Sequence, residues 1–184
     1  MPLSIFPKPY ADLVARLRVP SGFLLVAAFA WFAHPSPRSL AFGLPVSAVG
    51  LVLRAWAAGH LAKNQQLTTG GPYAYIRNPL YLGTLVVAAG LAIACRSLGL
   101  AILFALVFFF IYLPVIMLEE QHLRELFPDF GQYARTVPAL IPSGKRCTSS
   151  SHFSWPLYRK NQEYQALLGF MAGLAWLIWK TIWP

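Results

Sequence analysis

Charged side chains are scarce in this sequence of 184 residues, and acidic side chains are the scarcest. Only 11% of the residues are charged, with 15 Lys and Arg against 6 Asp and Glu, whereas 57% are hydrophobic. An average soluble domain is about 25% charged, so this chain lacks the charge that would cover the surface of a soluble fold. A disordered tail is excluded as well, because such segments are poor in apolar residues. The composition therefore indicates an integral membrane protein.

Cysteine is also rare. Cys95 and Cys147 lie far apart in the chain, which provides neither a disulfide framework nor the ligand spacing of a metal site. We therefore expect no bound metal. The length fits a single domain, residues 1–184.

Long apolar runs are abundant instead. A helix needs about 20 apolar residues to cross the hydrocarbon layer of a membrane. Five segments approach this length, and the first and third of them are short: Val19–Ala33, Leu40–Leu61, Leu80–Cys95, Leu98–Leu118 and Tyr164–Trp183. The sequence thus predicts an all-α integral membrane protein with about five transmembrane helices.

Two details refine this prediction. The first apolar run follows basic residues, as in a signal peptide, but no small-residue cleavage site comes after it, so we interpret it as a retained helix. Only Arg96 and Ser97 separate the third and fourth runs. These two spans are therefore expected to form a tight antiparallel hairpin.

The basic residues are distributed unevenly around the five runs. If the N-terminus is cytoplasmic, 11 basic residues fall in inner segments, 3 in outer segments and Arg54 within a span. Such an excess of Lys and Arg is typical of cytoplasmic segments, so the net charge of +9 is interpreted as a cytoplasmic layer rather than a nucleic-acid patch. The carboxylates fall on the same side, where we expect the polar chemistry. The inner basic residues are Lys8, Arg16, Arg18, Lys63, Arg77, Arg124, Arg135, Lys145, Arg146, Arg159 and Lys160.

The segment 70–83 joins turn-forming and polar residues at the start of the third span. Pro79 fits the first helical turn, and Asn78 before it is a good N-cap. A helix N-terminus beside Arg77 is a ready anion site, and the tyrosines of the segment could line a pocket for a flat ring or a cation. The alternative is a boundary turn without a ligand, because Tyr and Arg are common at membrane surfaces.

Two adjacent carboxylates, Glu119 and Glu120, end the fourth span. Carboxylates near a helix C-terminus oppose the helix dipole, which suggests compensation by a cation, a ligand or Arg124. A solvated boundary helix over 119–127 is the alternative. We favour a functional role, because a basic and an acidic motif at one membrane face would bracket a zwitterionic ligand.

Three further features carry weaker signals. The segment 127–133, followed by Val137-Pro138, indicates a packed loop whose aromatic residues are structural. Arg54 is an ionisable residue inside a span, which is a candidate functional residue by default, although it lies near enough to the inner end to snorkel. His60 could accept a proton, but a boundary histidine is more often just hydrogen-bonded.

Taken together, these motifs resemble the isoprenylcysteine carboxyl methyltransferase family, which is grouped with the phospholipid N-methyltransferases. The resemblance covers about Leu61 to Pro142, so residues 62–142 would form the signature region. In eukaryotic members His usually stands at the position of Asn78, and Asn cannot titrate, which argues against proton transfer there. The matching motifs are Gly71-Pro72-Tyr73-x-Tyr75-x-Arg77-Asn78-Pro79-x-Tyr81-x-Gly83, Glu119-Glu120-x-x-Leu123 and Phe130-Gly131-x-x-Tyr133.

The resemblance implies S-adenosylmethionine as the cofactor, bound at the cytoplasmic face of what would be a bacterial inner membrane. It also implies a lipid bilayer as partner and an amphipathic, membrane-resident methyl acceptor, either a prenylated carboxylate or thiol compound or a lipid head group. The residues implied in cofactor binding are Tyr73, Arg77, Asn78, Pro79, Tyr81, Leu82, Glu119 and Glu120. The candidates for catalysis are Arg54, which could guide an anionic head group, and His60 and Glu120, which could act as bases.

Two alternatives stay open at this point. An NADPH-dependent membrane lipid reductase could share this kind of C-terminal architecture, although no additional basic cluster for a 2′-phosphate accompanies Glu119 and Glu120. A membrane adaptor without enzymatic activity would have no affinity for either cofactor. The sequence does not name the methyl acceptor.

Overall fold

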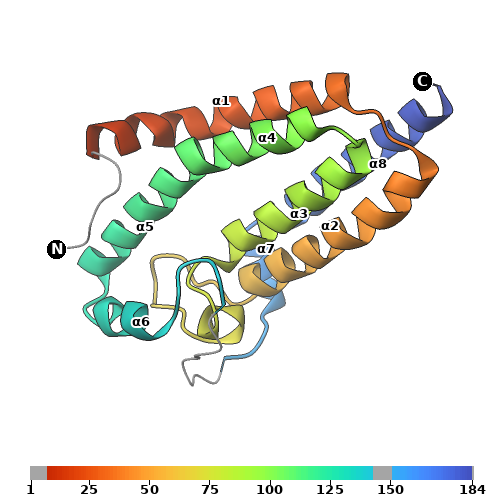
Figure 1. Cartoon of the computed structure of the whole chain (residues 1–184). Helices are drawn as coiled ribbons and strands as arrows, with labels where there is room; N and C mark the ends of the chain where they lie inside the picture. Colours follow the sequence, from red (N-terminus) through yellow and green to blue (C-terminus); the bar gives the residue numbers. More distant parts are fainter. Residues whose placement is uncertain (1–7, 143–150, 184) are drawn as a thin grey trace.

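The computed structural model describes residues 8–142 and 151–183, and in these ranges it contains helices and no strand (Figure 1). The predicted all-α class is therefore confirmed. Lys145, Arg146 and Cys147 lie outside the described residues. The helices are α1 (Lys8–Phe32), α2 (Pro37–Ala58), the 3₁₀ turn η1 (Gly71–Ala74), α3 (Pro79–Cys95), α4 (Leu98–Val107), the π-helical turn η2 (Phe108–Tyr112), α5 (Leu113–Leu126), α6 (Phe130–Thr136), α7 (Trp155–Lys160) and α8 (Tyr164–Ile182).

Each of the five apolar runs forms a helix. Three described helices are long and apolar enough to cross a membrane: Pro37–Ala58, the continuous rod Leu98–Leu126, and Tyr164–Ile182. The apolar parts of the other two, Val19–Phe32 and Pro79–Cys95, are shorter, so the count of five spans stays a prediction. Many large apolar side chains face outward, as they do in membrane proteins; Trp31, for example, is 78% exposed.

The polar segments gather at one end of the molecule. Residues 59–78, α6 and α7 lie together at the lower end of Figure 1, whereas the α3–α4 turn and the C-terminus lie at the opposite end. We call the former the polar end. The predicted helix over 119–127 is the last part of the α4–α5 rod rather than a separate element, because the rod continues without a break to Leu126.

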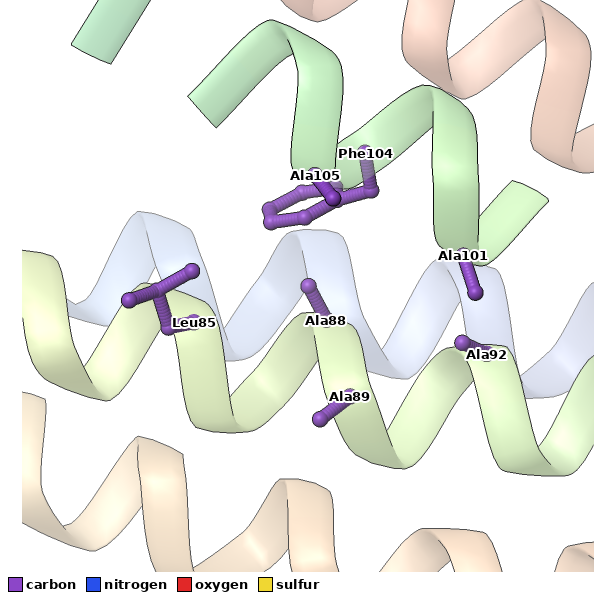
Figure 2. A pocket seen from close by; sticks show the side chains of 7 residues that line it. All are labelled: Leu85, Ala88, Ala89, Ala92, Ala101, Phe104 and Ala105. Atoms are coloured by element: carbon purple, nitrogen blue, oxygen red, sulfur yellow. The ribbon is translucent and has the colours of Figure 1, made fainter. Parts of the chain in front are cut away.

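The turn between α3 and α4 is as short as predicted. Arg96 adopts a left-handed conformation, with φ of 52°, and Ser97 accepts a hydrogen bond from the Leu100 backbone at the start of α4. The two helices nevertheless diverge from this turn towards the polar end (Figure 1). The predicted hairpin is therefore tight at its turn, and its two helices separate beyond it. Five alanines, Leu85 and Phe104 line an apolar cavity of about 220 Å³ between them (Figure 2).

A proline shapes the α4–α5 rod. Pro114 has no N–H to donate to the carbonyl of Phe110, four residues earlier, and the π-helical turn η2 lies directly before it. Tyr10 of α1 donates its hydroxyl to this Phe110 oxygen at 2.8 Å. A backbone carbonyl in an apolar layer needs such a partner. The bond therefore holds α1 against the α4–α5 rod.

The closest helix packing in the described chain joins α2 and α3. Gly43 and Gly50 on α2 face Gly90 and Gly83 on α3, and a Cβ added to Gly90 would lie 2.5 Å from the Gly43 carbonyl oxygen. Small residues allow backbones to approach in this way. Ser47 adds a hydrogen bond from its Oγ to the Val87 carbonyl at 3.0 Å. The start of α3 is thus fixed relative to the end of α2.

We expect Gly90→Ala to destabilise the fold by about 1–3 kcal/mol, because the new methyl group forces the α2 and α3 backbones apart. Gly169→Ala on α8 is the matched control, because a Cβ there meets nothing within 4 Å. The thermal unfolding midpoint in detergent should fall for Gly90→Ala and stay equal or rise for Gly169→Ala. Equal midpoints for Gly90→Ala and the wild type would show that the two helices are not closely packed.

Candidate active site

A cavity of about 760 Å³ lies at the polar end. We call it the polar cavity. Its walls come from the end of α2, the segment 61–73, the start of α3, α5 and α6. The polar residues that line it are Arg54, Lys63, Asn64, Gln66, Thr68, Tyr73, Arg77, Asn78, Tyr81, Thr84, Tyr112, Glu119, Glu120, His122 and Tyr133. Both motifs singled out in the sequence therefore contribute to one cavity.

Arg77 and Glu120 form a two-point ion pair in the wall of this cavity. The Nε atom of Arg77 lies 2.8 Å from Oε1 of Glu120, and Nη2 lies 2.9 Å from Oε2. Both side chains are largely buried, with exposures of 13% and 15%. Paired hydrogen bonds between a guanidinium and a carboxylate are strong and directional, so this pair fixes the start of α3 against α5.

The same guanidinium also holds the segment after α6. Nη1 of Arg77 donates to the carbonyl oxygens of Val137 at 2.6 Å and Ala134 at 2.9 Å. The backbone N–H of Arg77 donates to the Pro138 carbonyl at 2.9 Å. Arg77 thereby uses four of the five N–H groups of its side chain. Three segments that are distant in sequence meet at this one residue.

Asn78 stands at the N-cap position of α3, but its side chain makes no capping hydrogen bond. This part of the prediction is wrong, because the side-chain amide donates instead to Glu120 Oε1 at 2.9 Å and to the Ala139 carbonyl at 3.3 Å. The prediction for Pro79 is confirmed, since it lies in the first turn of α3. The two carboxylate oxygens of Glu120 thus receive hydrogen bonds from two consecutive residues, Arg77 and Asn78.

Glu119 is held by a different partner. The hydroxyl of Tyr81 donates to Oε1 of Glu119 at 2.9 Å, and the ring of Tyr81 stands edge-to-face to that of Tyr112. The α5 helix continues beyond both carboxylates to Leu126, so they do not lie at its C-terminus. Glu120 is compensated by Arg77 rather than by Arg124, whose guanidinium lies 5.2 Å from the centre of the Phe130 ring.

Tyr73 of η1 forms part of the cavity wall and is buried. Burial, followed by neighbouring groups that include Tyr133, Glu119 and Glu163, raises the pKa of its hydroxyl above the ordinary value. The Tyr133 hydroxyl donates to the Tyr73 carbonyl at 2.7 Å. The segment 127–133, predicted to be a packed loop, contains the start of the helix α6 instead. Its aromatic residues Phe130 and Tyr133 form a buried cluster with Val137, as expected for a structural role, and they also line the cavity.

The structure brings most, but not all, of the predicted site residues to the cavity. Neither Pro79 nor Leu82 is among the lining residues, and His60 is not among them either. His60 is buried, its Nδ1 lies 2.8 Å from the Trp56 carbonyl oxygen, and its ring stands edge-to-face to that of Phe153. The predicted residues that line the cavity are Arg54, Tyr73, Arg77, Asn78, Tyr81, Glu119 and Glu120.

Comparison with known proteins assigns a family to this architecture. Residues 39–129 match the family model described as phospholipid methyltransferase. This region contains most of α2, all of α3 and the α4–α5 rod, and both halves of the Arg77–Glu120 pair. Over this region, the chain matches the phospholipid methyltransferase family. The resemblance noted in the sequence is thereby confirmed, and the family consists of methyltransferases of the isoprenylcysteine and phospholipid type.

Three curated relatives extend this comparison. The cobalt-zinc-cadmium resistance protein CzcN of Cupriavidus metallidurans is 38% identical over 58% of this chain and 50% of its own length. The nickel-cobalt-cadmium resistance protein NccN of Alcaligenes xylosoxydans is 34% identical over 74% of this chain and 59% of its own. The protein-S-isoprenylcysteine O-methyltransferase of Schizosaccharomyces pombe is 30% identical over 73% of this chain and 59% of its own.

The chain thus spans between half and three fifths of the length of these relatives. No solved structure matches it. In the ranges 8–142 and 151–183, no group of three His, Cys, Asp or Glu side chains could hold a metal ion.

Sequence reasoning missed several residues that line the polar cavity. Thr84 and Tyr112 line it from within apolar runs, where polar side chains are expected to face the protein interior. That signal was available in the sequence. The segment 63–68 contributes four polar side chains at the rim, namely Lys63, Asn64, Gln66 and Thr68. No motif marked them, because single polar residues in a loop have no characteristic spacing.

The contact between Asn78 and Glu120 yields a test of the site's geometry. Asn78→Asp would place a carboxylate within hydrogen-bond distance of Glu120, and two such carboxylates repel each other. We expect a loss of about 1–3 kcal/mol in the free energy of unfolding at pH 7. The repulsion raises the folded-state pKa of the new carboxyl above about 3.9, its unfolded value. The deficit should therefore shrink as the pH falls from 7 towards 4.

The measurement is chemical or thermal unfolding in detergent at several pH values. Asn64→Asp is the control, because Asn64 is exposed at the rim and its left-handed backbone suits Asp. A stability of Asn78→Asp that equals the wild type at pH 7 would rule out the contact between residues 78 and 120.

Proposed function

We propose that this protein transfers a methyl group from S-adenosylmethionine to an amphipathic acceptor that resides in the membrane. The observation that carries the proposal is the polar cavity, whose Arg77–Glu120 and Tyr81–Glu119 contacts are built by the motifs of a methyltransferase family. The proposal assigns the cofactor to this cavity and the acceptor's apolar part to the membrane side.

The residues of the cavity fit this cofactor. Its volume of about 760 Å³ lies within the range of about 300–1,000 Å³ that is typical of small-molecule sites. S-adenosylmethionine has an ammonium group, a carboxylate, a ribose diol, a sulfonium and an adenine ring. We assign the ammonium or the ribose hydroxyls to Glu119 or Glu120, and the sulfonium or the adenine to Tyr73 and Tyr81, because carboxylates and aromatic rings attract cations.

Arg77 has a double role in this proposal. Four of its five N–H groups hold Glu120 and the segment 134–137, so its main contribution is to shape the site. The remaining N–H, together with the start of α3 at Asn78 and Pro79, suits the carboxylate of the cofactor. Leu82 follows one turn into α3 and would support this wall from behind.

The cofactor, when bound, would supply a methyl group attached to a positively charged sulfur. A lone pair of the acceptor would form a bond to the methyl carbon as the carbon–sulfur bond breaks, and the sulfur would remain as a neutral thioether. The chain's own contribution is to hold the two reactants in line and to exclude water. A carboxylate or thiolate acceptor needs no base, whereas an amine must first lose a proton.

The candidate bases are not well placed for proton removal. Glu120 accepts three hydrogen bonds from Arg77 and Asn78, and His60 is not among the residues that line the cavity. These placements favour an acceptor that attacks without losing a proton. The name of the S. pombe relative, an O-methyltransferase of isoprenylcysteine, describes a reaction of this chemical class.

An apolar cavity offers space for the tail of such an acceptor. Its lining includes Leu85 and Phe104 (Figure 2). These two residues pack against a buried cluster that contains Tyr81. Tyr81 also lines the polar cavity, so one buried cluster contacts the lining of both cavities. An acceptor with a long apolar chain could lie between α3 and α4 with its head group near Glu119. We further propose that the polar end faces the cytoplasm of a bacterial inner membrane, because Lys and Arg are typical of cytoplasmic segments. The basic residues at this end are Lys63, Arg77, Arg135, Arg159 and Lys160.

Ligand binding to the purified protein tests the proposal against the two alternatives. We expect S-adenosylmethionine, but not NADPH, to bind and to raise the unfolding midpoint. Glu119→Gln should weaken this binding at least tenfold, because it removes a charge from the cavity. Glu125→Gln, an exposed carboxylate on the same helix, should leave the affinity unchanged.

Binding of NADPH alone would favour the reductase alternative, and binding of neither would favour the adaptor. Incubation with radiolabelled methyl donor, a total lipid extract and prenylated thiols would then identify the acceptor class. Label in a compound with a long apolar chain is expected. Label only in water-soluble compounds would contradict the proposed membrane-resident acceptor.

A further inference from the structure

A second ion pair lies on the membrane side of the polar cavity. Arg54 of α2 lines the cavity, and its Nε and Nη2 atoms lie 2.6 Å and 3.0 Å from the two carboxylate oxygens of Glu163. Nη1 of Arg54 donates to Thr84 Oγ1 and to the Leu80 carbonyl. Glu163 is buried, with an exposure of 9%. The pair therefore joins three elements: α2, the first turns of α3 and the start of α8.

Glu163 belongs to a C-terminal segment outside the family match, which ends at residue 129. This segment is attached to the end of α2 by several contacts. The Ser154 N–H donates to the Gly59 carbonyl at 2.8 Å, and the side-chain amide of Asn161 donates to the carbonyls of Ala58 and Leu61 at 2.8 Å and 2.9 Å. Glu163 follows two residues later. Its position beside Arg54 is therefore set by the end of α2.

The ion pair changes the charge balance of the cavity. Three basic side chains but only two carboxylates are among the lining residues, namely Arg54, Lys63, Arg77, Glu119 and Glu120. Glu163 supplies a further carboxylate from behind the wall. After burial, Tyr133 and Glu119, it is also one of the groups that raise the pKa of Tyr73 in the cavity wall. Without Glu163, the membrane side of the cavity would have an unneutralised guanidinium.

We propose that Glu163 tunes the polar cavity for a cationic ligand by neutralising Arg54. This inference rests on the proposed function, in which the ligand is S-adenosylmethionine. Its sulfonium is positive, whereas the product S-adenosylhomocysteine has a neutral thioether at the same position. A nearby positive charge therefore weakens the binding of S-adenosylmethionine, whose sulfonium it repels, but not that of S-adenosylhomocysteine. Glu163 therefore acts on the preference for substrate over product, although it belongs to neither signature motif.

The ratio of the two dissociation constants tests this inference. Both ligands would be titrated at pH 7.5 into the wild type and into Glu163→Gln, each purified as the full chain in detergent. We expect Glu163→Gln to lower the affinity for S-adenosylmethionine about tenfold more than that for S-adenosylhomocysteine. This is the effect of one unit charge at a distance of about 10 Å with an effective dielectric constant of about 20.

Two further variants separate the charge effect from a structural effect. Arg54→Met leaves the negative charge of Glu163 and should shift the ratio in the opposite direction, towards S-adenosylmethionine. The double variant Arg54→Met/Glu163→Gln removes both charges and should restore the wild-type ratio, even though the ion pair is lost. If the ion pair only holds the helices together, each variant should lose affinity equally for the two ligands. The ratio of the two dissociation constants should then equal the wild-type ratio in both single variants as well as in the double variant.

Glu125→Gln serves as the matched control, because it removes an exposed carboxylate from α5 and should leave the ratio unchanged. An unchanged ratio in both single variants would overturn the inference. If Glu163→Gln fails to fold, the ratio of the two dissociation constants in Arg54→Met tests the inference: a shift towards S-adenosylmethionine supports it, and an unchanged ratio overturns it. Failure of the proposed function has a different signature, since the wild type would then bind neither ligand.

Discussion

The ion pair between Arg77 and Glu120 is the interaction on which the candidate site depends. A largely buried carboxylate such as that of Glu120 is tolerated only when a cation and hydrogen-bond donors compensate it. Arg77 and Asn78 supply both. The same guanidinium binds the carbonyls of Ala134 and Val137. The start of α3, the α5 helix and the loop after α6 are thereby held around one cavity.

The second ion pair, Arg54–Glu163, follows the same principle, with Arg54 in the lining of the same cavity. It joins the end of α2, the first turns of α3 and the C-terminal segment. The close packing of α2 on α3 determines how far the two helices are apart, because Gly50 and Gly83 allow no side chain between the backbones. The closely packed helices α2 and α3, together with the ion pairs Arg77–Glu120 and Arg54–Glu163, thus position the residues that would contact the ligand.

Much of this architecture could be predicted from the sequence for physical reasons. The thickness of the membrane fixes the length of apolar helices, so the five apolar runs were placed correctly as helices. The scarcity of charge made Arg77, Glu119 and Glu120 conspicuous, and the alternation of the runs predicted that they would share one end. The structure confirms that these three residues line one cavity.

Other features depend on contacts that no local pattern encodes. The partner of Arg54 lies 109 residues away in the sequence, and the pairing of Tyr10 with the Phe110 carbonyl joins residues 100 apart. The preference of α3 for α2 over α4 results from the register of glycines on two helices. Asn78 was expected to cap its own helix, because the sequence does not reveal that Glu120 competes for its amide.

A double-mutant cycle on S-adenosylmethionine binding tests the central claim, namely that Arg77 and Glu120 act as one unit. The variants are Arg77→Met, Glu120→Gln and their combination, with affinity measured by titration of the purified protein. If Arg77 acts mainly through Glu120, each single variant should lose at least about tenfold, and the double variant should bind within about threefold of the weaker single variant. Losses that multiply in the double variant would contradict the account, because they would show that the two residues contact the ligand independently.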